Sequence, residues 1–79
     1  MSPVVAQRLT RQEHTVLALI AEGRSNAGIA ERLGLTTRTV ETHTSRIFTK
    51  LDLEAHPSIH RRVLAAVTYH EAETALAGA

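Results

Sequence analysis

The sequence predicts a single all-α domain of four helices in a bundle-like arrangement, and three observations lead to this fold class. Apolar residues recur at helical spacing in four segments of the chain. Helix-capping residues precede three of these segments, and glycines follow two of them. The chain has 79 residues and no cysteine, so one small core without disulfides must stabilise it.

The first helix is expected to begin after Thr10 and to end at Gly23. Thr10 and Glu13 form the T-x-x-E pattern of a capping box, in which the two residues satisfy each other's free backbone N–H groups. Its core face consists of Val16, Leu17 and Ile20. We expect residues 1–8 to be a flexible tail or the end of a linker, because they contain Pro3 and no periodic pattern.

Two short helices joined by a tight turn are expected between residues 25 and 51. Ser25 caps the first of them, whose apolar positions are Ile29, Ala30 and Leu33. Gly34 ends that helix, because the left-handed backbone needed there costs glycine almost nothing, and Leu35 then turns into the core. Thr36 caps the next helix, which directs four residues inward: Val40, Thr44, Ile47 and Leu51.

The helix that Thr36 begins carries a polar face opposite this inward seam. Its members are Arg38, Thr42, Ser45 and Thr49, with Glu41 and Arg46 on the flanks. Phe48 is the one apolar residue that we expect to point outward. Short hydroxyl groups and cations without bulky apolar neighbours suit the edges of DNA bases and the phosphates beside them. The face therefore favours binding to double-stranded DNA.

The charge distribution agrees with this interpretation. Residues 24–50 carry a net charge of +3, residues 1–23 of zero and residues 51–79 of −2, within a total of +1. Positive charge on the middle segment is expected where a protein faces phosphate, although scatter among so few charged residues would also explain it. One Phe, one Tyr and no Trp leave too few aromatic side chains for stacking on single-stranded bases.

A fourth helix is expected over residues 58–76, with Pro57 near its start and a frayed end at residues 77–79. It carries two apolar stripes. The first is expected to pack on the core and consists of Val63, Val67 and His70, with Ala66 at its edge. The second is expected to contact a second copy of the chain and consists of Ala65, Tyr69, Ala72 and Leu76. Alternatively, its alanines only favour the helix and Tyr69 lies on the surface.

The span from Leu9 to Leu51 resembles the LuxR-type helix-turn-helix family, the DNA-binding domain of many bacterial transcription regulators. The matching residues are Leu9-Thr10, Glu13, Val16-Leu17, Gly23, Ser25-Asn26, Ile29-Ala30, Leu33, Thr39-Val40, His43 and Lys50-Leu51. At Gly28, Thr44 and Asp52 relatives usually carry a helix-favouring polar residue, a valine and a glycine, respectively. Residues 52–60 are also longer than the usual connection to the last helix.

The resemblance implies that the third helix lies in the major groove and that the domain regulates transcription. It assigns base contacts to Glu41, Thr42 and Ser45. It assigns phosphate contacts to Ser25, Asn26, Thr36, Arg38, Thr39, Arg46 and Lys50. Many relatives carry a basic residue at the position of Glu41, so this carboxylate either accepts from the amino group of cytosine or pairs with Lys50 or Arg38.

We expect residues 9–76 to be the C-terminal output domain of a longer regulator, because relatives usually carry this unit behind a receiver or ligand-sensing domain. Its expected partners are double-stranded DNA, a second copy bound weakly through the fourth helix on DNA, and RNA polymerase. Two alternatives stay open. One is a sigma-factor region-four module that meets promoter DNA within polymerase, and the other is a helical adaptor that binds protein without DNA.

Other kinds of chemistry find little support. His56 and His60 are four residues apart, but Pro57 lies between them and no third ligand follows at a fixed spacing, so no metal site is expected. His43 is expected to be packed and hydrogen-bonded near a phosphate. No catalytic carboxylate pair and no glycine-rich phosphate loop occur, so we expect neither an enzyme nor a cofactor nor a small-molecule substrate. Lacking an apolar span, the protein is expected to be cytoplasmic and nucleoid-associated.

Overall fold

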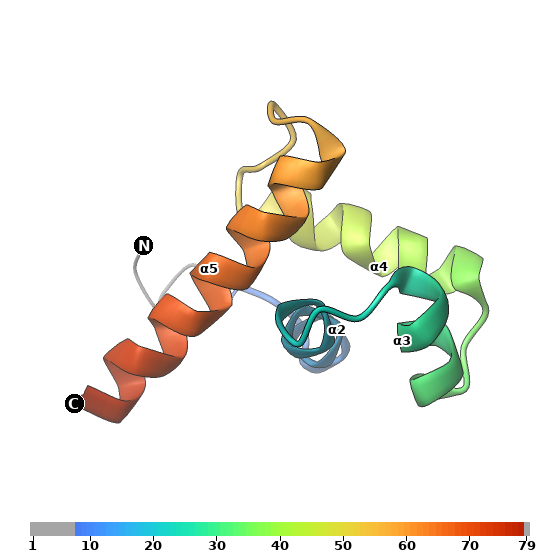
Figure 1. Ribbon diagram of the computed structural model, residues 1–79, viewed down its shortest axis with the longest axis horizontal. Coiled ribbons are helices and arrows are strands. Elements are labelled where there is room, and N and C mark those ends of the chain that lie inside the picture. Colours follow the sequence, from blue (N-terminus) through green and yellow to red (C-terminus); the bar gives the residue numbers. More distant parts are fainter. Residues whose placement is uncertain (1–7, 79) are drawn as a thin grey trace.

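The computed structural model of the chain describes the backbone of residues 8–78 and their side chains other than those of 58, 59 and 75–78. Within this span the chain forms four helices and no strand. They are α2 (Arg11–Ala21), α3 (Asn26–Leu33), α4 (Thr37–Lys50) and α5 (Ser58–Gly78). α2 contacts the other three helices, and α3 also packs on α4. The C-terminal half of α5 extends away from α3 and α4 (Figure 1). The all-α prediction is confirmed.

The helix starts are determined by short-range hydrogen bonds, as the sequence predicts. Thr10 Oγ1 accepts from the backbone N–H of Glu13 at 3.1 Å, and Glu13 Oε1 accepts from the N–H of Thr10 at 2.9 Å, which completes the capping box of α2. The hydroxyl oxygens of Ser25 and Thr36 each accept from the N–H three residues later, at 3.1 Å. The three predicted N-caps are therefore confirmed.

The turn between α3 and α4 also follows the prediction. Gly34 ends α3 with φ 68, in the left-handed region. A Cβ atom at this position would meet nothing within 4 Å, so the backbone conformation alone favours glycine there. The N–H of Leu35 donates to Ala30 O at 2.9 Å, and the Leu35 side chain packs against the core. These contacts hold the start of α4 beside α3.

α4 buries its predicted seam and one further residue. The seam residues, each at most 5% exposed, are Val40, Thr44, Ile47 and Leu51. Phe48 is only 8% exposed, so the prediction that it points outward is wrong. α4 ends in a left-handed cap, in which Asp52 has φ 63 and the N–H of Leu53 donates to Phe48 O at 2.7 Å. Leu53 is buried in the same core cluster as Phe48. The guanidinium of Arg61 from α5 lies 5.3 Å from the centroid of the Phe48 ring.

The predicted faces of α5 are reversed, which corrects the expected dimer contact. Ala65 is fully buried in the core and Ala72 is also buried, whereas Val63 and Val67 are 58% and 45% exposed. Tyr69 is half-buried and packs against the core. Small side chains let α5 approach α2 closely, and this approach decides which face is buried.

α5 contains one buried hydroxyl group and continues to Gly78. Thr68, which lies between Ala65 and Ala72 in the sequence, is also buried. Its hydroxyl group is satisfied because it donates to Leu64 O at 2.8 Å. The helix runs to Gly78, so residues 77 and 78 are helical where a frayed end was expected. The side chain of Leu76, expected in the dimer contact, lies outside the described residues.

Candidate DNA-binding surface

The outward face of α4 brings together the residues expected to contact bases. Glu41, Thr42 and Ser45 are exposed and lie beside two exposed arginines. Together they line an open hollow of about 350 Å³, formed by Arg38, Glu41, Thr42, Ser45 and Arg46. Every residue that lines it is polar. The hollow therefore offers hydrogen-bond donors and acceptors but no apolar side chain.

The hydroxyl of Thr42 is already used as a donor. Thr42 Oγ1 donates to the backbone oxygen of Arg38 at 3.1 Å, one helical turn earlier. Its oxygen lone pairs and its methyl group are left for a ligand. Thr42 is thus suited to accept from a base amino group or to contact the methyl group of thymine.

The Glu41 carboxylate makes no ion pair with any residue that the structure describes, although Arg38 and Arg46 share its hollow. The first partner proposed for such a pair, Lys50, is engaged elsewhere. Glu41 is therefore an exposed acceptor on the face of α4. The alternative of an ion pair with Lys50 or Arg38 is therefore not formed among the described residues, and the cytosine contact stays a prediction.

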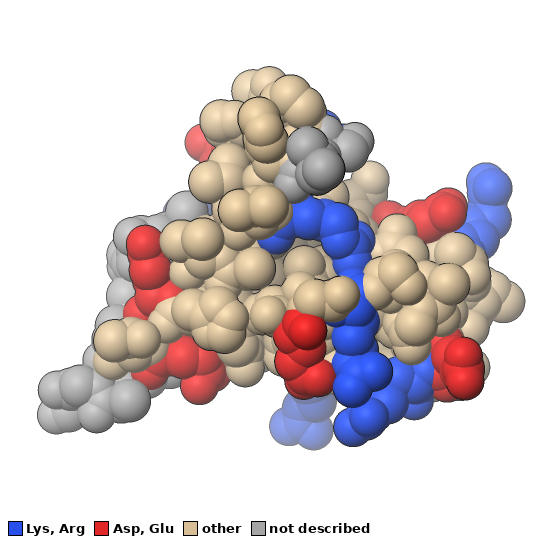
Figure 2. All heavy atoms as spheres, in the orientation of Figure 1, with Lys and Arg blue, Asp and Glu red and all other residues tan. Residues whose placement is uncertain are grey.

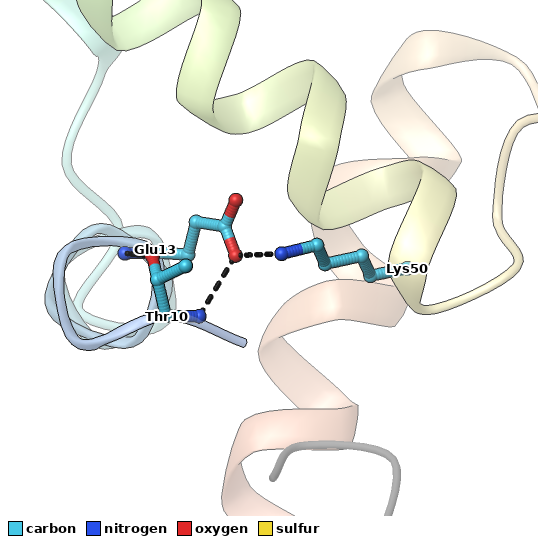
Figure 3. A network of polar contacts seen from close by, with 3 residues as sticks. All are labelled: Thr10, Glu13 and Lys50. Carbon is cyan, nitrogen blue, oxygen red and sulfur yellow. Dashed lines mark hydrogen bonds and ion pairs between the residues drawn. The ribbon is translucent and has the colours of Figure 1, made fainter. Parts of the chain in front are cut away.

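Lys50 is the last residue of α4, and its side chain points to the N-terminal end of α2 (Figure 3). Its Nζ lies 2.6 Å from Glu13 Oε1, and the Glu13 side chain is only 3% exposed. Burial by itself raises the pKa of Glu13, but the hydrogen bonds from Lys50 Nζ and the Thr10 N–H and the positive charge of Lys50 together outweigh it, so this pKa lies below its ordinary value. The pair joins the C-terminal end of α4 to the capping box of α2. A phosphate contact by Lys50 stays a prediction.

The starts of α3 and α4 present free hydroxyl hydrogens. Ser25 Oγ acts only as an acceptor within the described residues, so its hydrogen is available to a ligand. Thr36 Oγ1 donates to Thr39 Oγ1 at 2.9 Å, which leaves the Thr39 hydroxyl as the available donor of that pair. All three residues are exposed. Hydroxyl and backbone N–H donors at helix N-termini are suited to phosphate oxygens.

Asn26, another residue expected at a phosphate, lies partly inside the domain. Its Oδ1 accepts from Arg62 Nη1 of α5 at 2.9 Å and lies 3.4 Å from the hydroxyl of Thr44. Arg62 Nη2 also donates to Arg24 O at 2.6 Å. Sequence reasoning missed Arg62, because nothing in the spacing of the sequence connects it to a residue 36 positions earlier.

Comparison with known proteins identifies the family. The model of bacterial regulatory proteins of the luxR family matches residues 7–63, more than half of the chain. The chain belongs to the luxR family of bacterial regulatory proteins. In this luxR-family domain, α3, the turn at Gly34 and α4 form the helix-turn-helix.

Curated relatives of this luxR-family domain are longer proteins. The oxygen regulatory protein NreC of Staphylococcus haemolyticus strain JCSC1435 is 45% identical over 51 residues, which cover 65% of this chain and 24% of NreC. The transcriptional regulatory protein LiaR of Bacillus subtilis strain 168 is 47% identical over 47 residues, which cover 60% of this chain and 22% of LiaR. The chain thus aligns with about a quarter of the length of these relatives. No solved structure matches it.

The histidines of the luxR-family domain are arranged differently from the expectation in one case. His43 is half-buried, but its Nδ1 is buried without a hydrogen-bond partner among the residues that the structure describes, where a hydrogen-bonded ring was expected. His56 and His60 line an apolar hollow of about 240 Å³ with Val63 and Leu64.

In the described part of the chain, no group of three or more His, Cys, Asp or Glu residues could hold a metal ion. None of the described helices is long and apolar enough to span a bilayer.

Proposed function

We propose that α4 inserts into the major groove of double-stranded DNA and that Glu41, Thr42 and Ser45 contact base edges. The observation that carries the proposal is the exposed hollow on α4, which is lined by polar side chains alone, two of them arginines. Of the three contacts, that of Glu41 is the most specific. An unpaired carboxylate repels phosphate but accepts well from the amino group of cytosine, so Glu41 selects a cytosine at one position of the site.

Phosphates of the DNA backbone bind around this reading face. The proposed phosphate contacts are Ser25, Asn26, Thr36, Arg38, Thr39, Arg46 and Lys50. The free hydroxyl hydrogens of Ser25 and Thr39 and the first N–H groups of α3 and α4 support the neutral contacts. Exposed Arg38 and Arg46 supply the charge that makes binding depend on salt.

A second copy docks weakly through the exposed stripe of α5 when both copies are on DNA. Val63 and Val67 are exposed on this stripe, and Val67 lines an open, largely apolar hollow of about 470 Å³ with His70, Glu71 and Thr74. Such a small contact suits copies that pair only when DNA holds them side by side. The two half-sites would then lie one turn of DNA apart, about 34–36 Å.

The domain acts by binding rather than catalysis, as the C-terminal output domain of a longer regulator. The short aligned fraction of NreC and LiaR supports this, since most of each relative lies outside the match. We place its action on chromosomal DNA in the bacterial cytoplasm, with RNA polymerase as a further partner.

Selection of bound duplexes from a random pool tests the proposal. The parent protein should select one motif, and Glu41→Ala should lose discrimination of about 1–3 kcal/mol at a single position where the parent selects cytosine. Glu31→Ala removes the same charge from the exposed surface of α3 and is the matched control. An identical motif for the parent and Glu41→Ala would contradict the placement of α4. A parent that shows no salt-dependent binding to duplex DNA would indicate a protein-binding adaptor instead.

A further inference from the structure

Arg62 reaches from α5 to the start of α3. Its two terminal nitrogens donate to Asn26 Oδ1 at 2.9 Å and to the backbone oxygen of Arg24 at 2.6 Å. Basic side chains form a band between α2 and α3 on this face of the molecule (Figure 2). Apart from such side-chain contacts, α5 packs mainly on α2. Arg62 is therefore a direct link between α5 and the first turn of the helix-turn-helix.

Asn26 lies where three helices meet. It is the first residue of α3, directly after the cap Ser25. Besides the contact with Arg62, its Oδ1 lies 3.4 Å from the hydroxyl of Thr44, which belongs to the buried seam of α4. The position of this one amide group thus depends on α4 and α5 together. Its amide nitrogen makes no hydrogen bond within the described residues and is available as a donor.

Both acceptors of Arg62 are neutral. Within the described residues it makes no ion pair, and burial lowers the pKa of its guanidinium, which nevertheless stays protonated. A carboxylate at position 26 would bind Arg62 more strongly, but it would bring negative charge to the start of α3. Neutral acceptors therefore hold the guanidinium in place without adding negative charge at the start of α3.

We propose that Arg62 is a positioning residue for DNA binding, which orients Asn26 and the loop before α3 so that the first turn of α3 meets a phosphate. The inference rests on the proposed function, in which Ser25 and Asn26 lie at the DNA backbone. Arg62 itself does not contact the phosphate. Its effect passes through the Asn26 amide and the Arg24 carbonyl.

The test compares Arg62→Met with Arg61→Met in titrations of duplex DNA of random sequence over a range of salt concentrations. Both variants lose one charge at adjacent positions, but only the first loses the contacts to the start of α3. Arg62→Met should bind about ten-fold more weakly, because it loses two hydrogen bonds from a charged group. Its salt slope should match that of the parent, since no phosphate contact is removed. Arg61→Met should stay within about two-fold of the parent in DNA affinity, because the Arg61 guanidinium contacts the Phe48 ring and the backbone oxygen of His56 instead of the start of α3.

Three further results decide the outcome. Arg62→Lys should recover part of the affinity, because one ammonium group reaches only one of the two acceptors. If Arg62→Met does not fold, the cycle of Arg62→Lys with Asn26→Ala replaces it, and the two changes should be non-additive in DNA affinity. Additive effects, an unchanged affinity of Arg62→Met, or a salt slope lower by about one unit would overturn the proposal. A parent that binds no duplex would overturn the proposed function with it, whereas a binding parent with an unaffected Arg62→Met overturns this inference alone.

Discussion

Removal of the Lys50 side-chain charge should destabilise the domain, because Glu13 would keep its charge in a buried position. In Lys50→Met the Glu13 side chain, only 3% exposed, retains the Thr10 N–H as a donor but loses the ammonium group 2.6 Å away. Loss of one partner costs about 3–5 kcal/mol for a fully buried pair. Lys50 is one-third exposed, so water screens part of the interaction, and we expect about 2 kcal/mol. In a domain of this size that lowers Tm by roughly 10 °C.

The pH dependence of this effect has a definite sign. In the parent the pKa of Glu13 is lowered from its ordinary value of 4.5, so the pair contributes stability that is present above that pH and is lost as pH falls through the lowered pKa. In Lys50→Met only the hydrogen bonds of Thr10 still lower the pKa of Glu13, and we expect burial to outweigh them and to raise this pKa. Above pH 4.5 the charged Glu13 carboxylate then destabilises the folded variant, and protonation of Glu13 removes this destabilisation. The difference in stability between parent and variant should therefore shrink as pH falls from neutral toward 4.5.

Thermal and denaturant unfolding at several pH values measure both effects. Glu13→Gln is the matched variant, since its amide oxygen can still accept from Thr10 while the Lys50 ammonium turns to solvent, so it should cost less than Lys50→Met. The double variant should likewise be more stable than Lys50→Met alone. Equal stability of Lys50→Met and the parent at neutral pH, or a deficit that grows in acid, would refute the reasoning. In DNA titrations the same variant tests the phosphate contact, which predicts a salt slope lower by about one unit.

Two other substitutions test the fold and the assembly. Asp52→Gly should stabilise the domain by up to about 1 kcal/mol, because Asp52 adopts φ 63 where glycine carries no Cβ strain; a lower midpoint of denaturation would show that the Asp52 side chain contributes more than that strain. Val67→Glu should leave the fold and half-site binding intact but abolish cooperative binding to paired half-sites, whereas Ala72→Glu should destabilise the fold because Ala72 is buried. Titrations of paired and single half-sites measure the first effect and thermal melts the second, and cooperative binding by Val67→Glu would place the dimer contact elsewhere.

The helix starts and the turn of this domain are encoded locally. Each predicted cap, at Thr10, Ser25 and Thr36, accepts a hydrogen bond from the backbone N–H three residues later. Gly34 adopts φ 68, and no other part of the fold lies where its Cβ atom would be. The inward seam of α4 follows from helical spacing in the same way. The polar face opposite it was predictable for the same reason, because one helix determines both faces.

The tertiary structure alone decided the orientation of α5 and the long-range polar contacts. Both stripes of α5 have helical spacing, so the sequence pattern could not choose between them, and close packing against α2 selected the side with alanines. Phe48 became buried because it packs in the same core cluster as Leu53 and the Arg61 guanidinium lies over its ring. The pairs Lys50–Glu13 and Arg62–Asn26 join residues 37 and 36 positions apart. Such contacts depend on how whole helices are placed, which periodicity and capping do not specify, since both describe only neighbours along the chain.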